Sequence, residues 1–114
     1  LVMDAGRRDA EAARDVLARD ESNYLASRRL ALALYQLGRL QEAEATYRQV
    51  FAAYPSDIDM LAGAGWCRLR LGDAAAASQA FEQVLTLAPL HIAARAGQAL
   101  LVRRDEKTKT RPHP

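Results

Sequence analysis

Residues 24–57 read YLASRRLALALYQLGRLQEAEATYRQVFAAYPSD, and residues 58–91 read IDMLAGAGWCRLRLGDAAAASQAFEQVLTLAPLH. Pro55 and Pro89 align the two segments and set an offset of 34 residues between matching positions. At that offset, like residues recur: Leu37-Gly38 and Leu71-Gly72, Ala43 and Ala77, Tyr47 and Phe81, and Val50 and Val84. Self-similarity at one period of about 20 to 50 residues is typical of a repeat architecture. The sequence therefore indicates an array of like units.

Each unit is predicted to fold as two helices. The apolar half of the composition is mainly Ala and Leu, which are strong helix formers, and β-branched residues are few. Gly38 and Gly72 are expected to end the first helices, because glycine readily adopts positive φ at a helix C-terminus. Pro55 and Pro89 are expected to end the second helices, because the residue before a proline disfavours helical geometry. The expected helices span residues 24–37, 40–54, 57–71 and 73–88.

This pattern resembles the tetratricopeptide-repeat (TPR) family. Numbered from Tyr24 and from Ile58, the family pattern has small residues at places 8 and 20, an aromatic at 24 and a proline at 32. The chain supplies Ala31 and Gly65, Ala43 and Ala77, Tyr47 and Phe81, and Pro55 and Pro89. It departs at place 4, often Trp, and at place 11, usually Tyr, where it has Ser27 and Leu61, and Leu34 and Arg68. The resemblance implies an all-α fold, an α-α superhelix or TPR solenoid of antiparallel helix pairs.

The register continues less cleanly on both sides of these units. An upstream segment resembles a degenerate second helix of a preceding repeat, and a downstream segment the first helix of a further repeat or a capping helix. Because the chain begins with Leu1, we expect it to be a fragment of a larger protein. The expected organisation is a TPR array at 1–104, with repeats 24–57 and 58–91 and half-repeats 6–19 and 92–104, and a disordered polar, basic tail at 105–114.

Charge and hydropathy argue against two classes of partner. Residues 103–111 carry a net charge of +3, which leaves −1 for residues 1–102 of the total of +2. A nucleic-acid binder carries its basic stripe on the fold, so no nucleic-acid partner is expected. No apolar run approaches the roughly 20 residues of a membrane-spanning helix, so no membrane insertion is expected. Arg-rich, Lys-poor usage favours a bacterial origin, and both a cytoplasmic and a periplasmic location are compatible with the sequence.

The resemblance implies that ligands bind a concave groove formed by the first helix of each pair. Its inner-facing places 2, 5, 9, 12 and 13 follow one stripe of the 3.6-residue helical period. Trp66 is interpreted either as an aromatic anchor for a ligand or as core packing. The arginines are interpreted either as a cationic wall that grips carboxylates or as a solvated, ion-paired face. The candidate peptide-binding residues are Arg28, Leu32, Tyr35, Gln36, Ala62, Trp66, Leu69, Arg70 and Arg103.

One subclass of the family grips the C-terminal carboxylates of heat-shock chaperones. Its pattern has Lys and Asn at places 5 and 9, Asn at place 6 of the next unit, and Lys and Arg at places 2 and 6 of the third. Only the first of these places is similar in this chain, so this subclass is not expected. The residues that stand there are Arg28, Leu32, Gly63, Ala93 and Gly97.

No catalytic or metal site is expected. Cys67 is interpreted as a small buried hydrophobe, since a nucleophilic thiol needs a histidine nearby. The two histidines are His91, in a turn, and His113, in the tail. Asp57 and Asp59 are interpreted as a helix cap and a dipole partner. Without a phosphate loop or a metal-ligand cluster, the chain is expected to be no enzyme and to use no cofactor.

The predicted function is a protein–protein interaction module or scaffold, which binds a peptide or helix of a partner protein in the concave groove. One alternative is a structural assembly module that self-associates as a homo-oligomer through exposed terminal helices. Its apolar surface would come from Ile92, Leu100, Leu101 and Val102. The other alternative is a spacer segment of a longer TPR array with no ligand of its own.

Overall fold

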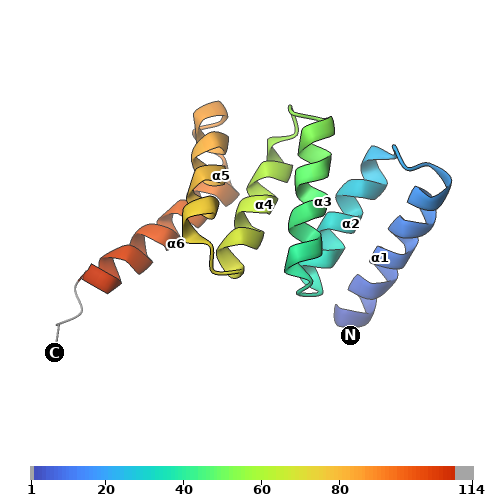
Figure 1. The fold of residues 1–114 in the computed structure, drawn as a ribbon, viewed down its shortest axis with the longest axis horizontal. Helices are drawn as coiled ribbons and strands as arrows, with labels where there is room; N and C mark the ends of the chain where they lie inside the picture. The colour runs from blue at the N-terminus through green and yellow to red at the C-terminus, as the bar shows by residue number, and fades with distance from the viewer. Residues whose placement is uncertain (1, 110–114) are drawn as a thin grey trace.

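The fold is a row of helices. The computed structural model describes the backbone of residues 2–109 and the side chains of residues 5–107. Over that backbone there are six α-helices and no strand: α1 (Val2–Arg19), α2 (Tyr24–Gln36), α3 (Leu40–Ala53), α4 (Ile58–Arg70), α5 (Ala74–Leu87) and α6 (Ile92–Lys109). Figure 1 shows α1 to α5 side by side in chain order, with α6 running obliquely away at the end opposite α1. The predicted all-α helical-repeat solenoid is confirmed.

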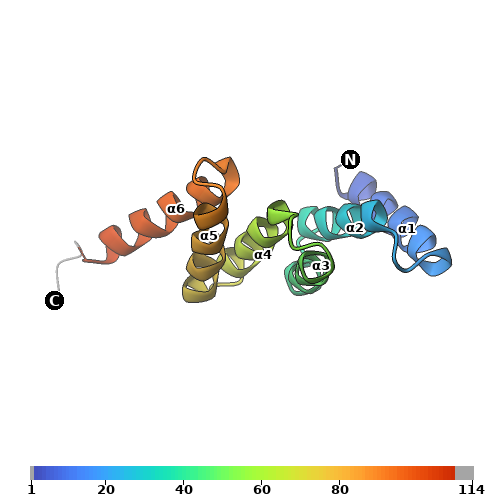
Figure 2. The same cartoon turned by 90° about the horizontal axis from the view of Figure 1, so that it is seen from above.

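The row is elongated, with extents of 57 × 33 × 19 Å. Each helix packs against the next in the chain, and α4 also touches α2 and α6, the first helices of the neighbouring pairs. Seen from above in Figure 2, successive helices turn relative to one another. Each pair can therefore bury its apolar surface only against its neighbours, as expected of stacked repeats.

The helix bounds agree with the sequence in the centre and differ at both ends. The four central helices begin and end within one residue of the predicted positions. In α1 the helix begins at Val2 rather than at Gly6. The expected disorder from Asp105 onward is corrected, because α6 continues to Lys109. That stretch contains no glycine or proline, and its Glu and Lys residues favour helix. Residues 110–114 of the predicted tail lie outside the described part of the chain.

The two glycine turns are alike. Gly38 and Gly72 have φ of 78° and 90°, in the region that favours glycine. After Gly38, the N–H of Arg39 donates to the carbonyl of Leu34 at 2.9 Å, and the same bond follows Gly72 one repeat later at 2.9 Å. This is the hydrogen bond of a Schellman helix end. The repeated turn gives both helix pairs the same local geometry.

Aromatic rings that pack against glycines join each helix pair to the next. A Cβ atom built on Gly63 would lie 2.5 Å from the Tyr47 ring, and one on Gly97 would lie 2.3 Å from the Phe81 ring. Phe81 also covers Gly65, where a Cβ would lie 2.7 Å from the ring. The Tyr47–Gly63 contact thus recurs one repeat later as Phe81–Gly97. The second helix of each pair can approach the following first helix closely only because these positions lack a side chain.

Candidate functional site

A shallow hollow lies where α2, α4 and the start of α6 meet. We call it the central hollow; its volume is about 440 Å³. Four of the nine candidate peptide-binding residues line it, namely Leu32, Tyr35, Ala62 and Trp66. Its full lining is Leu32, Tyr35, Tyr47, Asp59, Ala62, Gly63, Trp66, His91 and Ala93. The first helices of successive pairs therefore line one common surface. Its volume, its largely apolar lining and its few polar groups are typical of a ligand site.

Trp66 is held by packing on one side and lines the central hollow on the other. Its ring packs edge-on against Phe81, with centroids 5.9 Å apart and planes at 65°. Its indole N–H donates to the carbonyl of Ala93 at 3.0 Å, which ties α4 to the first turn of α6. The ring is nevertheless half-exposed and lines the central hollow. Core packing thus holds the indole in position while part of its surface remains open.

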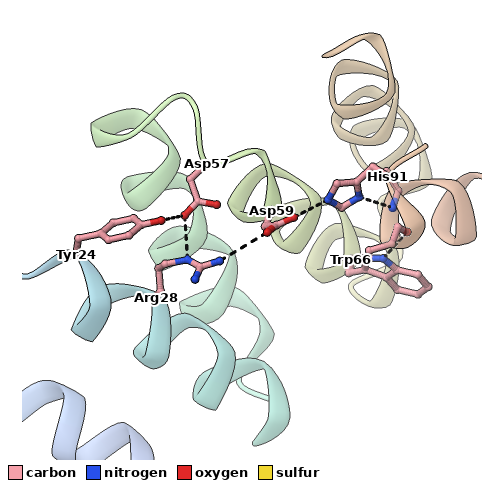
Figure 3. A network of polar contacts seen from close by, with 8 residues as sticks. Tyr24, Arg28, Asp57, Asp59, Trp66 and His91 are labelled. Carbon is pink, nitrogen blue, oxygen red and sulfur yellow. Dashed lines mark hydrogen bonds and ion pairs between the residues drawn. The ribbon is translucent and has the colours of Figure 1, made fainter. Parts of the chain in front are cut away.

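A chain of polar contacts borders the hollow (Figure 3). Arg28 forms ion pairs with Asp57, from Nε at 2.9 Å, and with Asp59, from Nη2 at 3.7 Å. The Tyr24 hydroxyl donates to the same Asp57 carboxylate, which raises the pKa of Tyr24. On the other side, Asp59 lies 2.6 Å from Nε2 of His91. Two carboxylates pair with Arg28, so of the two interpretations of the arginines its contacts fit the ion-paired face.

His91 has two partners that fix its tautomer. The backbone N–H of Ala94 donates to Nδ1 of His91 at 3.2 Å, so Nδ1 is an acceptor without a proton. The proton of the neutral ring then lies on Nε2, which donates to Asp59. By accepting from the first turn of α6, the imidazole caps that helix as an N-cap side chain does. His91 therefore joins α4 to the start of α6, as Trp66 does through the carbonyl of Ala93.

The aspartates at the helix starts differ from one another. Asp73 caps α5, with its carboxylate accepting from the N–H of Ala76 at 3.1 Å. Asp57 makes no side-chain cap hydrogen bond to α4. Asp57 thus stands at the N-cap position of α4 as interpreted, but its carboxylate pairs with Arg28 on α2 and does not cap the helix. Asp59 likewise bridges neighbouring elements through Arg28 and His91, beyond its place in the first turn.

The other candidate residues are spread over several places. The guanidinium of Arg70 lies over the ring of the lining residue Tyr35, 4.9 Å from its centroid; Arg70 is exposed and is not itself among the lining residues. Leu69 is buried in the core with Phe81, so its assignment to the groove is corrected. Gln36 lines a different hollow, between α1 and α2. Arg103 is exposed on α6 and is not among the residues that line the central hollow.

Five lining residues were not among the candidates. Asp59 and Ala93 occupy place 2 of their units, so the inner-facing stripe contained the signal for both. His91 precedes the first residue of α6, which is the position of an N-cap. Tyr47 was recognised only as the aromatic at place 24 of the family pattern, and Gly63 only as a departure from the carboxylate-binding subclass. The missed residues are Tyr47, Asp59, Gly63, His91 and Ala93.

The described side chains include one buried thiol and no group of metal-ligating residues. Burial raises the pKa of the Cys67 thiol to about 12, so it stays protonated and poorly nucleophilic near neutral pH. Among the described residues, no three His, Cys, Asp or Glu side chains are grouped so as to hold a metal ion. No helix in the described part of the chain combines the length and apolar character needed to cross a membrane.

Comparisons with known proteins agree with this architecture. Two tetratricopeptide-repeat models match residues 4–58 and 58–89. A solved structure of the second TPR domain of human RPAP3, in complex with the HSP70 peptide SGPTIEEVD, is 28% identical. The match covers 84% of this chain and 80% of that one, with a TM-score of 0.77. The Arabidopsis OM64 TPR domain, at 16% identity, has the same fold over 90% of this chain and 96% of that one, with a TM-score of 0.71.

No curated protein sequence matches the chain. On the repeats, the fold and these matches together, the chain belongs to the tetratricopeptide-repeat family.

Proposed function

We propose that this TPR domain, a protein-interaction module, binds a peptide or short helix of a partner protein in the central hollow. The observation that carries the proposal is the open face of Trp66 beside Leu32 and Tyr35 on a surface of about 440 Å³. Large aromatic side chains that are held in place lose little freedom on binding and often supply most of the energy of an interface. An apolar side chain of the ligand would fill the space between these three residues.

The positive charge of Arg70, beside the lining residue Tyr35, favours a ligand that has an acidic residue next to its apolar anchor. Arg70 stacks on Tyr35 through its guanidinium face, and no ion pair of Arg70 is found among the described residues. Its N–H edges are suited to a carboxylate in the bidentate geometry that arginine prefers. Asp59 and His91 satisfy each other on the opposite edge. We therefore propose a ligand with one apolar anchor flanked by Asp or Glu on the Arg70 side.

The similarity to the RPAP3 domain supports a peptide as the class of ligand, since that domain was solved with an HSP70 peptide. The mode of capture should differ. Arg28, the one residue similar to the carboxylate-binding subclass, is engaged by two aspartates. We therefore expect an internal acidic and apolar segment to bind more tightly than the free C-terminus of SGPTIEEVD.

Trp66 is the sole tryptophan, so its fluorescence reports on the hollow. The probes are amidated peptides with one Leu or Phe anchor and flanking Glu, Lys or neutral residues. The Glu-flanked peptides should give a saturable change, and Arg70→Glu should weaken their binding at least about tenfold, the loss of one charge-assisted contact. Arg103→Glu, an equal change of charge away from the hollow, is the matched control and should bind like the wild type.

Two outcomes would contradict the proposal. A response that survives both Arg70→Glu and Leu32→Asp would mean that the ligand binds elsewhere. No response to any peptide, with Trp66→Phe altering stability alone, is the behaviour of a spacer segment.

Self-association is the second candidate function. Ile92 is 85% exposed although it is large and apolar, and Val102 is exposed on the same helix. Leu100 and Leu101, which the sequence also assigned to this surface, are instead half-buried against the core. An apolar surface at one end of a stacked row favours contact with another copy, which would appear as a mass that increases with concentration.

A further inference from the structure

The α6 end of the row has the face of a first helix without a second helix on it. One repeat earlier, α5 covers the matching face of α4: a Cβ on Gly65 would lie 3.2 Å from Cβ of Ala80. Arg68 on the same face donates to the carbonyl of Ala76 at 3.4 Å. The counterparts of Gly65 and Arg68 on α6 are Ala99 and Val102, and both are exposed. Among the described residues, none packs on this face of α6 in the way that α5 packs on the matching face of α4.

The α1 end has the complementary feature. Between α1 and α2 lies a second hollow of about 480 Å³, which we call the N-terminal groove. Its Ala13 and Val16 correspond, one repeat later, to Tyr47 and Val50, which pack in the core with residues of α2. The groove is therefore where a first helix would lie ahead of α1. Its lining is Asp9, Ala12, Ala13, Val16, Asn23, Leu25, Ala26, Arg29, Leu32, Ala33 and Gln36.

From these two ends we infer that α6 of one copy of the chain occupies the N-terminal groove of a second copy. The two copies then associate head to tail, and α6 pairs with the second copy's α1 as one repeat shared between two chains. This inference rests on the second candidate function, self-association, and specifies its geometry. The N-terminal groove shares only Leu32 with the central hollow, and the inference does not depend on peptide binding.

The repeat itself indicates which residues would meet. Within the chain, Tyr24 and Arg28 of α2 contact Asp57 and Asp59 through hydrogen bonds and ion pairs. At the junction between copies, Ile92 and Ala96 on α6 of the first copy take the places of Tyr24 and Arg28. Asn23 and Leu25 of the second copy take the places of Asp57 and Asp59. A polar junction is thus replaced by a mainly apolar one.

The exposure of these residues supports the match. Ile92 is 85% exposed and Leu25 is 58% exposed, and the repeat brings the two together. The same translation sets Ala99 against Ala12 and Ala13, because Gly65 lies against Ala80 and Phe81. Small residues on both sides allow a close helix approach.

Head-to-tail contact uses a different surface on each partner, so it does not stop at two copies unless a ring closes. A symmetric dimer through α6 would stop at two. The two single-site variants Ile92→Asp and Leu25→Asp distinguish these cases, because each disables one end and leaves the other intact. Both sites are exposed, and circular dichroism and thermal melting check that the fold is retained.

The experiment is sedimentation velocity of the full chain over a range of concentrations. Wild type should gain mass steadily with concentration, each variant alone should remain a monomer, and an equimolar mixture of the two should form a 1:1 dimer. Leu87→Asp, at another exposed apolar site, is the matched control and should associate like the wild type.

The other outcomes are equally decisive. If wild type is a monomer at every concentration, self-association and its head-to-tail form are both wrong. If Ile92→Asp is monomeric while Leu25→Asp still dimerises, self-association stands and the contact is α6 on α6. If a mixture of the variants stays monomeric although wild type associates, the head-to-tail geometry alone is contradicted. None of these results bears on peptide binding by the central hollow.

Discussion

The indole N–H of Trp66 donates to the carbonyl of Ala93 at 3.0 Å, and the same ring lines the central hollow. The hydrogen bond crosses from α4 to α6, so the wall of the proposed binding site is also a joint between repeats. A ligand that contacts the indole therefore also contacts the joint. Binding is expected to stabilise α6 against the rest of the array by mass action.

Gly97→Ala should destabilise the protein. An added methyl would lie 2.3 Å from the Phe81 ring, so α6 or the ring must move, at a cost of about 1–3 kcal/mol for overpacking. In an exposed helix the same change stabilises by up to about 1 kcal/mol, so the sign is diagnostic. Urea unfolding measures it, and a rise in the midpoint would show that the close contact is absent.

Arg28→Ala should cost more than the loss of an ordinary surface ion pair. The side chain of Asp57 is only 10% exposed, and its carboxylate would lose its nearest cation. A polar group left buried without its partner costs about 1–3 kcal/mol, and a charged group costs more. Arg14→Ala, which removes an exposed pair with Glu42, is the control and should cost less than about 1 kcal/mol. Equal losses for the two variants in denaturant unfolding would refute the distinction.

His91→Ala should loosen the start of α6, and His91→Asn should restore most of it. The Nδ1 acceptor caps the N–H of Ala94, and loss of an N-cap costs about 0.5–2 kcal/mol. Asparagine keeps an acceptor at that position. Amide hydrogen exchange at Ala94 should accelerate in the alanine variant and recover in the asparagine one. Unchanged exchange in the alanine variant would argue against a capping role.

Stability should fall in alkaline solution. Burial raises the pKa of Cys67 from 9.0 to about 12 and that of Tyr47 from 10.0 to about 12. Between these values the unfolded chain loses protons that the folded chain keeps, so the free energy of unfolding decreases as pH rises from about 9 to about 12. The Cys67→Ala, Tyr47→Phe double variant should show a shallower decrease in its thermal midpoint over that range. An equal slope in both proteins would contradict the assignment.

The fold followed from the sequence because each signal was local and repeated. Gly38 and Gly72 end their helices at positive φ. The 34-residue offset placed the bounds of the four central helices to within one residue. The prediction at the C-terminal end was wrong because it relied on polarity. Asp105 to Lys109 are polar, but glycine and proline, which end a helix, are absent from them.

The site was harder to predict because a helix in the middle of a row has neighbours on more than one side. Leu69 fits the inner-facing stripe by spacing, yet that part of α4 also faces the core around Phe81. The interpretation of Trp66 stayed open because its ring both packs against Phe81 and lines the central hollow. Asp57 was expected to serve its own helix, whereas the arginine that it pairs with lies on α2. Such contacts depend on how repeats stack, which a single helical pattern does not encode.

The central claim, that a partner peptide binds the central hollow, is tested most directly by mapping amide chemical shifts during a peptide titration. The probe is an amidated peptide with one leucine between glutamates. We expect the largest shifts at the Trp66 indole and at Ala62 and Gly63, with Thr46 and Gln79 unaffected on the second helices. Shifts confined to Thr46 and Gln79, with the indole signal unmoved, would contradict the account.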